Sequence, residues 1–124
     1  MSDLGWIGVD LDGTLAEYGE WQGPEHIGRP IPRMVERVKE WLAAGRDIRI
    51  FTARVGPKLG DEADRSRVAI TAWCIEHLGR PLPVTATKDY QMIELWDDRC
   101  VQLITNTGMR VDCPAPSGTP GGET

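Results

Sequence analysis

One segment constrains the fold of this chain more than any other: residues 4–11 read LGWIGVDL, an almost unbroken apolar run. Residues 10–14 then read Asp-Leu-Asp-Gly-Thr, so the run ends in acid and passes into a turn signal. A continuous apolar run is typical of a strand that is covered on both faces. We therefore expect residues 4–11 to form an inner strand of a parallel sheet.

Signals for helices and strands alternate along the rest of the chain. We expect a loop or flap over residues 16–30, a helix from Pro32 to Gly45, and a second helix that Asp61 caps and Gly79 ends. Further strands are predicted at residues 47–52, 83–86, 94–97 and 101–104, with a return at 109–111. This order predicts an α/β fold with a mainly parallel sheet and helices on both faces.

The length of 124 residues suits one domain, which we place at residues 1–112. Residues 113–124 are rich in Pro, Gly, Ser and Thr, and we expect a disordered tail there. The three cysteines have no C-x-x-C spacing, which favours reduced thiols over disulfides or a zinc site. No targeting segment or membrane-spanning run is visible, so we expect a cytoplasmic protein with no membrane partner.

The formal net charge of −5 argues against a dedicated nucleic-acid binder, which usually carries a basic surplus. It leaves open contact with a nucleic-acid end, because a few local arginines can override the overall sign.

Three short motifs stand at the ends of predicted strands: residues 10–14 (DLDGT), 51–54 (FTAR) and 96–99 (WDDR), with Lys88 between the last two. In open α/β sheets, ligands bind outside the carboxyl ends of the strands. The motifs therefore predict one site, made of Asp10, Asp12, Thr52, Lys88, Asp97 and Asp98.

Four carboxylates in one place repel one another. Two unit charges about 4 Å apart interact with about 4 kcal/mol at an effective dielectric of about 20. Either some of these acids are protonated or a cation lies among them. Oxygen ligands select a hard ion, and Mg²⁺ binds through a few carboxylates together with substrate phosphate. We therefore expect Mg²⁺ as the cofactor.

On these motifs the chain resembles the haloacid dehalogenase (HAD) superfamily of phosphohydrolases. Residues 10–14 match the first motif of that family, Thr52 the second, Lys88 the third and residues 97–98 the fourth, in the family's order. The resemblance spans residue 4 to about residue 112. It implies a three-layer Rossmann-like fold and a phosphatase that hydrolyses phosphate monoesters.

The resemblance also implies roles for individual residues. Asp10 would attack phosphorus and form an aspartyl phosphate, and Asp12 would act as general acid and then base. Thr52 and Lys88 would hold the phosphoryl oxygens. The implied magnesium ligands are the Asp10 carboxylate, the Asp12 backbone carbonyl and Asp97, while Asp98 either joins them or orients Lys88 or a water.

Several further assignments stay open at the level of sequence. Lys58 competes with Lys88 for the phosphate-binding role. Arg54 and Arg99 can each bind phosphate bidentately or pair with surface acids. Trp21, in the predicted flap, is the tryptophan that we expect to touch substrate.

Only about fifteen residues separate Thr14 from Pro30, so the chain resembles a form of the family without a substantial cap. An open site suits a large substrate such as a nucleic-acid end, or it needs a second subunit to close it. The expected substrate is therefore a phosphorylated small molecule or a nucleic-acid end, and a homo-oligomer would be the means of closing the site. The FTAR and WDDR forms are also similar to the 3′-phosphatase domain of bacteriophage polynucleotide kinases. The alternatives to a general phosphatase are therefore a nucleic-acid 3′-end phosphatase and a non-catalytic binding module.

Overall fold

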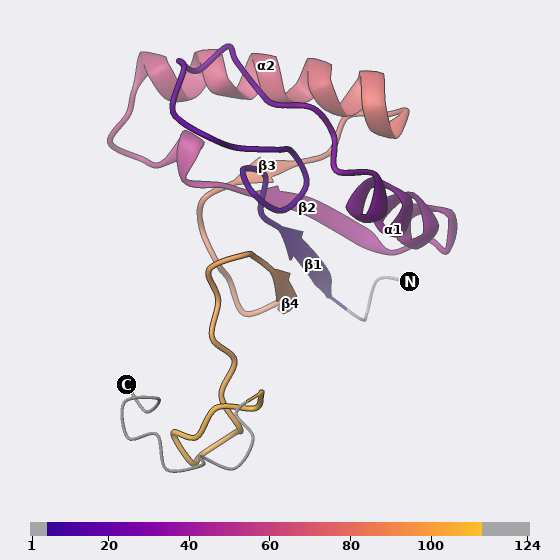
Figure 1. The fold of residues 1–124 in the computed structure, drawn as a ribbon, viewed down its shortest axis with the longest axis vertical. Coiled ribbons are helices and arrows are strands. Elements are labelled where there is room, and N and C mark those ends of the chain that lie inside the picture. Colours follow the sequence, from indigo (N-terminus) through magenta and orange to yellow (C-terminus); the bar gives the residue numbers. More distant parts are fainter. Residues whose placement is uncertain (1–4, 113–124) are drawn as a thin grey trace.

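The computed structural model of the chain describes residues 5–112 (Figure 1). Its elements are β1 (Trp6–Val9), α1 (Pro32–Ala43), β2 (Asp47–Phe51), the short 3-10 helix η2 (Ala53–Val55), α2 (Asp61–Leu78), β3 (Val84–Thr85) and β4 (Met92–Trp96). These elements follow the order that the sequence predicts. The α/β class is therefore confirmed.

The four strands form one parallel sheet in the order β3-β2-β1-β4. β1 lies between β2 and β4, and every residue of β1 is buried, as the continuous apolar run predicts. The parallel pairing brings the carboxyl ends of β1, β2 and β4 to the same edge of the sheet.

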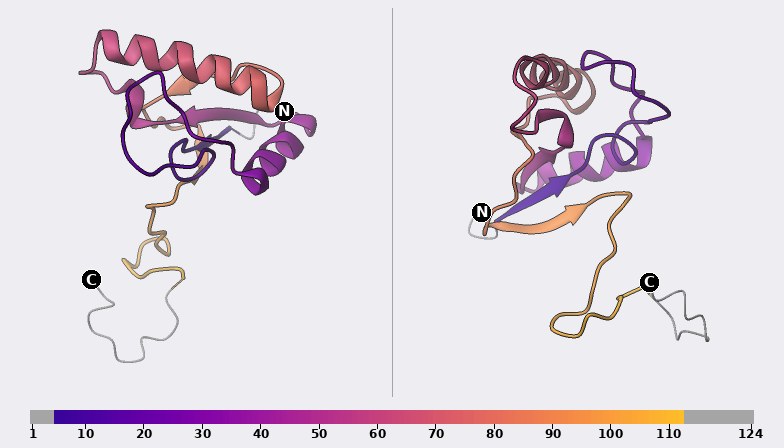
Figure 2. Two further views of the ribbon diagram at one scale, coloured as in Figure 1. Left: turned by 45° about the horizontal axis from the view of Figure 1, so that its top comes forward. Right: turned by 90° about the vertical axis from the view of Figure 1, so that its left-hand side faces the viewer.

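Both helices pack on the same face of this sheet (Figure 2). On that face β1 contributes Ile7 and Val9 and β2 contributes Ile48 and Ile50, and these residues share one core with both helices. The two crossovers step along the sheet in the same direction, and right-handed crossovers of that kind place their helices on one side. Within residues 5–112 the expected helical layer on the second face is therefore missing.

A short link replaces that third layer. Residues 86–91 join β3 to β4, and six residues are too few for a crossover helix. The link runs beside β1: Trp6 Nε1 donates a 2.8 Å hydrogen bond to Asp89, and Trp6 N donates to the Gln91 carbonyl at 2.9 Å. Trp6 is 1% exposed, so the link and its neighbours cover this side of β1 without a helix.

The helix boundaries agree with the sequence signals at three of four ends. Pro32 opens α1, and Gly45 and Gly79 follow the two helices with φ of +84° and +89°. Asp61 is the first residue of α2 rather than its cap; Gly60 holds the cap position without a side-chain hydrogen bond. Asp61 instead lies in the first turn, where a negative charge is favourable.

The last predicted strand, residues 101–104, does not join the sheet. It forms an antiparallel return whose single bridge pairs Leu103 with Arg110, and Figure 1 shows this segment extending away from the sheet. The predicted tail, 113–124, lies outside the described residues, as does Cys113. Within the described part of the chain Cys74 is a buried free thiol and Cys100 an exposed one. Neither helix of that part combines the length and hydropathy that a membrane span requires.

Candidate metal and phosphate site

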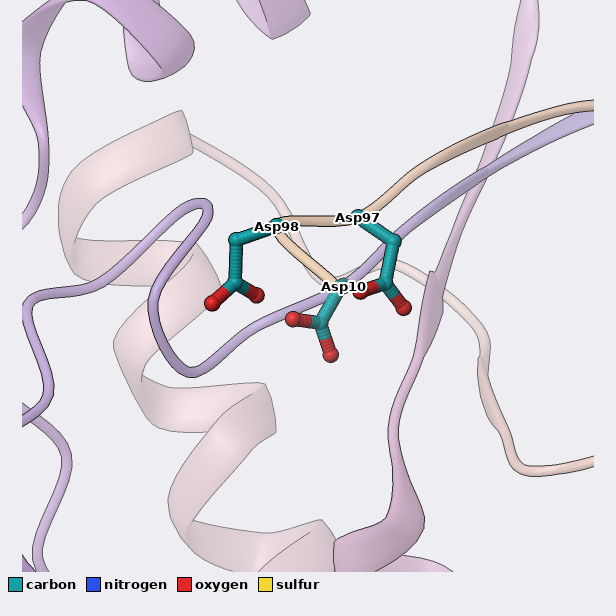
Figure 3. Close-up of side chains that lie close together, drawn as sticks. All are labelled: Asp10, Asp97 and Asp98. Atoms are coloured by element: carbon teal, nitrogen blue, oxygen red, sulfur yellow. The ribbon is translucent and has the colours of Figure 1, made fainter. Parts of the chain in front are cut away.

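The carboxyl ends of β1 and β4 place three acids side by side. Val9 pairs with Trp96 in the parallel register, and the Asp10 backbone N–H donates a 2.9 Å hydrogen bond to the Trp96 carbonyl. The next residues, Asp97 and Asp98, therefore stand against Asp10. One carboxylate oxygen of each of the three acids lies within 4.8 Å of the other two (Figure 3).

Thr14, in the turn after β1, contacts two of the three acids of this cluster. Thr14 Oγ1 lies 3.2 Å from an oxygen of Asp10 and 3.2 Å from an oxygen of Asp98, and it accepts a 3.0 Å hydrogen bond from the Asp98 N–H. Its single hydroxyl hydrogen can go to either carboxylate. Thr14 had no predicted role, although its place in the Asp-Gly-Thr turn was the available signal.

Gly13 lets that turn approach Asp98. Its φ is +89°, and a Cβ at this position would lie 2.6 Å from Asp98 Oδ2. An L-residue side chain would therefore be strained by the backbone conformation and would also push Asp98 away. Glycine is required at this position on both grounds.

The environment of Asp10 disfavours the charged form of its carboxyl group. Burial raises its pKa, and the charge of Asp97 and the hydrogen bond with Asp98 raise it further, against a lowering by the Thr14 hydroxyl, to about 7. Repulsion among acids at the site is the expected result of placing them together. A cation between the carboxylates would remove it.

The Asp12 carboxylate is not part of this cluster and binds Arg54 of η2 instead. Both of its carboxylate oxygens accept hydrogen bonds from Arg54, from Nε at 2.7 Å and from Nη2 at 2.9 Å. This pair is bidentate, and the Arg54 side chain is only 5% exposed. The side chains of Asp10, Asp97 and Asp98 therefore gather, and that of Asp12 does not join them. The ligand expected from Asp12 is its backbone carbonyl, so the position of its side chain leaves that expectation standing.

Arg54 also fixes the flap, residues 16–30, over the site. Its guanidinium donates to the backbone carbonyls of Pro24 at 3.3 Å and His26 at 2.9 Å, and it lies 4.8 Å from the centre of the Trp21 ring. The flap has no helix or strand of its own, although bridges and backbone hydrogen bonds close its base. Four hydrogen bonds and the Trp21 ring thus occupy the Arg54 guanidinium. Of the two roles that the sequence left open for Arg54, pairing with an acid is the one that the structure shows, and its partner is Asp12.

Thr52 follows β2 and is buried at the same edge. Its hydroxyl accepts a 3.2 Å hydrogen bond from the Arg54 N–H and caps η2. Lys88, by contrast, is exposed in the link between β3 and β4 and does not line the cavity at the site. Lys58, the sequence-level competitor, is also exposed and outside the lining.

A cavity of about 550 Å³ opens over the carboxylate cluster. Its acidic lining comprises Asp10, Asp12, Asp97, Asp98 and Glu62, and its basic lining comprises Arg54 and Arg99. The flap adds Tyr18 and Trp21, and Phe51 and Leu59 complete the apolar part. Since Asp12 already neutralises Arg54, the remaining lining carries a clear excess of negative charge.

The cluster has the chemistry of a hard-cation site. All three side chains offer oxygen, and Mg²⁺ takes oxygen ligands at about 2.0–2.1 Å in an octahedron, which places opposite ligands about 4 Å apart. The carboxylate oxygens already lie within 4.8 Å of one another, so small rotations bring them to that spacing. Asp10, Asp97 and Asp98 are therefore the residues that fit a magnesium ion.

No family model matches this sequence, and no curated protein sequence matches it significantly. Among solved structures, the chain is similar to a conserved protein from Bacteroides thetaiotaomicron, with 22% identity over 78% of each chain and a TM-score of 0.54. At that identity the likeness extends to the fold alone. What these comparisons establish is a small α/β chain with a Rossmann-like, all-parallel four-stranded sheet.

Proposed function

We propose that this protein is a magnesium-dependent phosphatase of the HAD type that hydrolyses a phosphate monoester through an aspartyl phosphate on Asp10. The observation that carries the proposal is the convergence of Asp10, Asp97 and Asp98 to within 4.8 Å at the carboxyl edge of the sheet. The order of the sequence motifs supports the same reaction, because the first acid of the first motif is the one in the cluster.

The proposed reaction has two displacements. An Asp10 carboxylate oxygen attacks phosphorus, the bond from phosphorus to the ester oxygen breaks, and the alcohol leaves with a proton. Water then attacks the phosphorus of the aspartyl phosphate, and loss of a proton and of the Asp10 carboxylate releases inorganic phosphate. One molecule of water is consumed, and Asp10 is regenerated.

Asp10, Asp97 and Asp98 would hold Mg²⁺, which when bound supplies the positive charge that lets a phosphate dianion approach a carboxylate. Thr14 keeps the Asp10 and Asp98 carboxylates in place through its hydroxyl. The buried Thr52 lies at the same edge and can donate its hydroxyl hydrogen to a phosphoryl oxygen while its oxygen caps η2.

Asp12 is the proposed acid and base, and Arg54 orients it. Each carboxylate oxygen has a second lone pair, so the two bonds from Arg54 leave one position on each oxygen for a proton. Lys88 receives no part in this scheme, because it is exposed and does not line the cavity. Arg99 does line the cavity and is the better-placed cation for phosphoryl oxygens.

The test is phosphate release from a panel of phosphate monoesters with added Mg²⁺. We expect release by the wild-type chain, loss of release in Asp10→Asn, and full release in the control Tyr90→Ala, whose side chain is 98% exposed and outside the cavity. Acid quenching during turnover should trap one phosphoryl group on the peptide that contains Asp10. An active Asp10→Asn variant would refute the mechanism, and magnesium binding without any turnover would favour the non-catalytic binding module.

A further inference from the structure

The cavity over the carboxylate cluster has a second, aromatic part that the phosphatase reaction does not use. Tyr18 and Trp21 of the flap line it, and each is 47% exposed. Full burial of these rings would stabilise the fold further, so their exposure costs the protein some stability. Exposed apolar surface of this kind often marks a binding site. The two rings share their cavity with Asp10.

Trp21 is held in a defined position from one side. The Arg54 guanidinium lies 4.8 Å from the centre of the ring, and that guanidinium is itself fixed by Asp12 and by the carbonyls of Pro24 and His26. A cation over one face of the indole ring is a favourable contact and limits ring rotation. The exposed part of the ring is therefore presented to the cavity by a rigid support.

Two more side chains anchor the flap. Trp73 of α2 donates from Nε1 to the Gly28 carbonyl at 3.0 Å, and Arg65 of α2 pairs with Glu25 at 3.1 Å. The flap is thus attached to α2 as well as to Arg54. A flap that is already ordered loses little conformational entropy when a ligand binds. Most of the favourable energy of a stacking contact on Trp21 therefore contributes to the binding free energy.

The charge of the cavity restricts what can stack there. Five acids and two arginines line it, and a divalent cation at the cluster still leaves the lining no more than weakly charged overall. A leaving group with additional phosphates would meet Glu62 and the acids of the cluster, with Arg99 as the one lining arginine that Asp12 does not already neutralise. A neutral planar ring meets the aromatic wall without that repulsion, and a cavity of about 550 Å³ is in the usual range for a small-molecule ligand.

From the shared cavity, the fixed indole and the acidic lining we infer that the substrate is a nucleoside monophosphate, whose base stacks on Trp21 while its phosphate meets the Asp10 cluster. This inference rests on the proposed phosphatase activity. A phosphorylated oligonucleotide carries the same base and phosphate, but its further phosphates would face the excess of acids in the lining.

The experiment compares two substrates that differ by the base alone: a nucleoside monophosphate and the corresponding ribose phosphate. Stacking of a base on an aromatic side chain corresponds to a preference of about 5- to 150-fold. We expect kcat/KM of the wild-type chain to favour the nucleotide by that factor. Trp21→Ala should bring the ratio of the two kcat/KM values close to one, whereas Trp21→Phe should keep most of it.

Because the measured quantity is a ratio, a general disturbance of the flap that slows both substrates leaves it unchanged. Tyr90→Ala, which removes an exposed ring outside the cavity lining, is the matched control and should keep the wild-type ratio. Equal hydrolysis of both substrates by the wild-type chain, or an unchanged ratio in Trp21→Ala, would overturn the inference and leave the phosphatase standing. Hydrolysis of neither substrate nor of any other phosphate monoester would overturn both, and faster release from a phosphorylated oligonucleotide than from the mononucleotide would assign the site to strand ends instead.

Discussion

Arg54 binds both carboxylate oxygens of Asp12, at 2.7 and 2.9 Å, across 42 positions of sequence. The same guanidinium holds two flap carbonyls and supports the Trp21 ring. One buried cation therefore connects the turn after β1, the edge of β2 and the flap. Its loss would leave Asp12 and the flap carbonyls without their partners.

Arg54→Met should consequently destabilise the chain by about 3 kcal/mol, at the lower end of the range for breaking a buried ion pair, because Asp12 is partly exposed. The free energy of unfolding in urea measures this. The control is Arg29→Met in the same flap, whose pair with Glu17 is 3.6 Å long and highly exposed, and which should cost less than about 1 kcal/mol. Equal costs for the two variants would contradict the structural role of Arg54.

Gly13→Ala should weaken magnesium binding as well as stability. The backbone at φ +89° strains any L-residue, and the added Cβ would lie 2.6 Å from an Asp98 oxygen. Gly45→Ala is the matched control, since φ there is +84° and nothing lies within 4 Å of the added atom. Gly45→Ala should lose about 1–2 kcal/mol of unfolding free energy from the backbone strain alone, and Gly13→Ala should lose more because of the contact with Asp98. Calorimetric titration with Mg²⁺ should show a loss of affinity in Gly13→Ala alone.

Thr14→Val should lower magnesium affinity about 10- to 100-fold, the range for losing a group that orients a metal ligand. The valine keeps the shape of threonine but removes the hydroxyl that contacts Asp10 and Asp98. Thr107→Val removes a comparable turn hydroxyl, bonded to Ile104 and Met109, in the return that lies off the sheet. An affinity that falls equally in both variants would argue against a specific role for Thr14.

The stability of the metal-free chain should depend on the protonation of Asp10. Burial, followed by the charge of Asp97, raises its pKa from 3.8 to about 7, so between these values the folded chain binds more protons than the unfolded one. The contribution of Asp10 to the unfolding free energy must then fall as pH rises from about 4 to 7 and level off above. Urea unfolding of wild type and Asp10→Asn in chelator measures the difference, and a flat difference across that interval would contradict the account.

The elements of the sheet were predictable because their signals are local. The apolar run of β1, Pro32 at the start of α1 and the glycines after both helices are each readable from a few neighbouring residues. The missing second helical layer was also implicit, since the predicted strands at 83–86 and 94–97 leave only residues 87–93 between them, too few for a crossover helix. Asp61 was misassigned as a cap because Gly60, which has no side chain to signal the position, precedes it.

The sequence predicts the part of the site that lies directly at the ends of strands. Asp10, Asp97 and Asp98 follow adjacent parallel strands, so their convergence follows from the order of the sheet. The pairing of Arg54 with Asp12 joins residues 42 positions apart, so no local sequence pattern predicts it. The place of Lys88 depends on the path of the β3–β4 link, which leads it away from the cavity.

The most direct measurement is a calorimetric titration of the wild-type chain and Asp97→Asn with Mg²⁺, with Glu62→Gln as a control that removes a charge from the same cavity but not from the cluster. The account predicts one ion bound per chain in wild type and Glu62→Gln, and loss of that binding in Asp97→Asn. Absence of binding in wild type, or equal binding in Asp97→Asn, would contradict it.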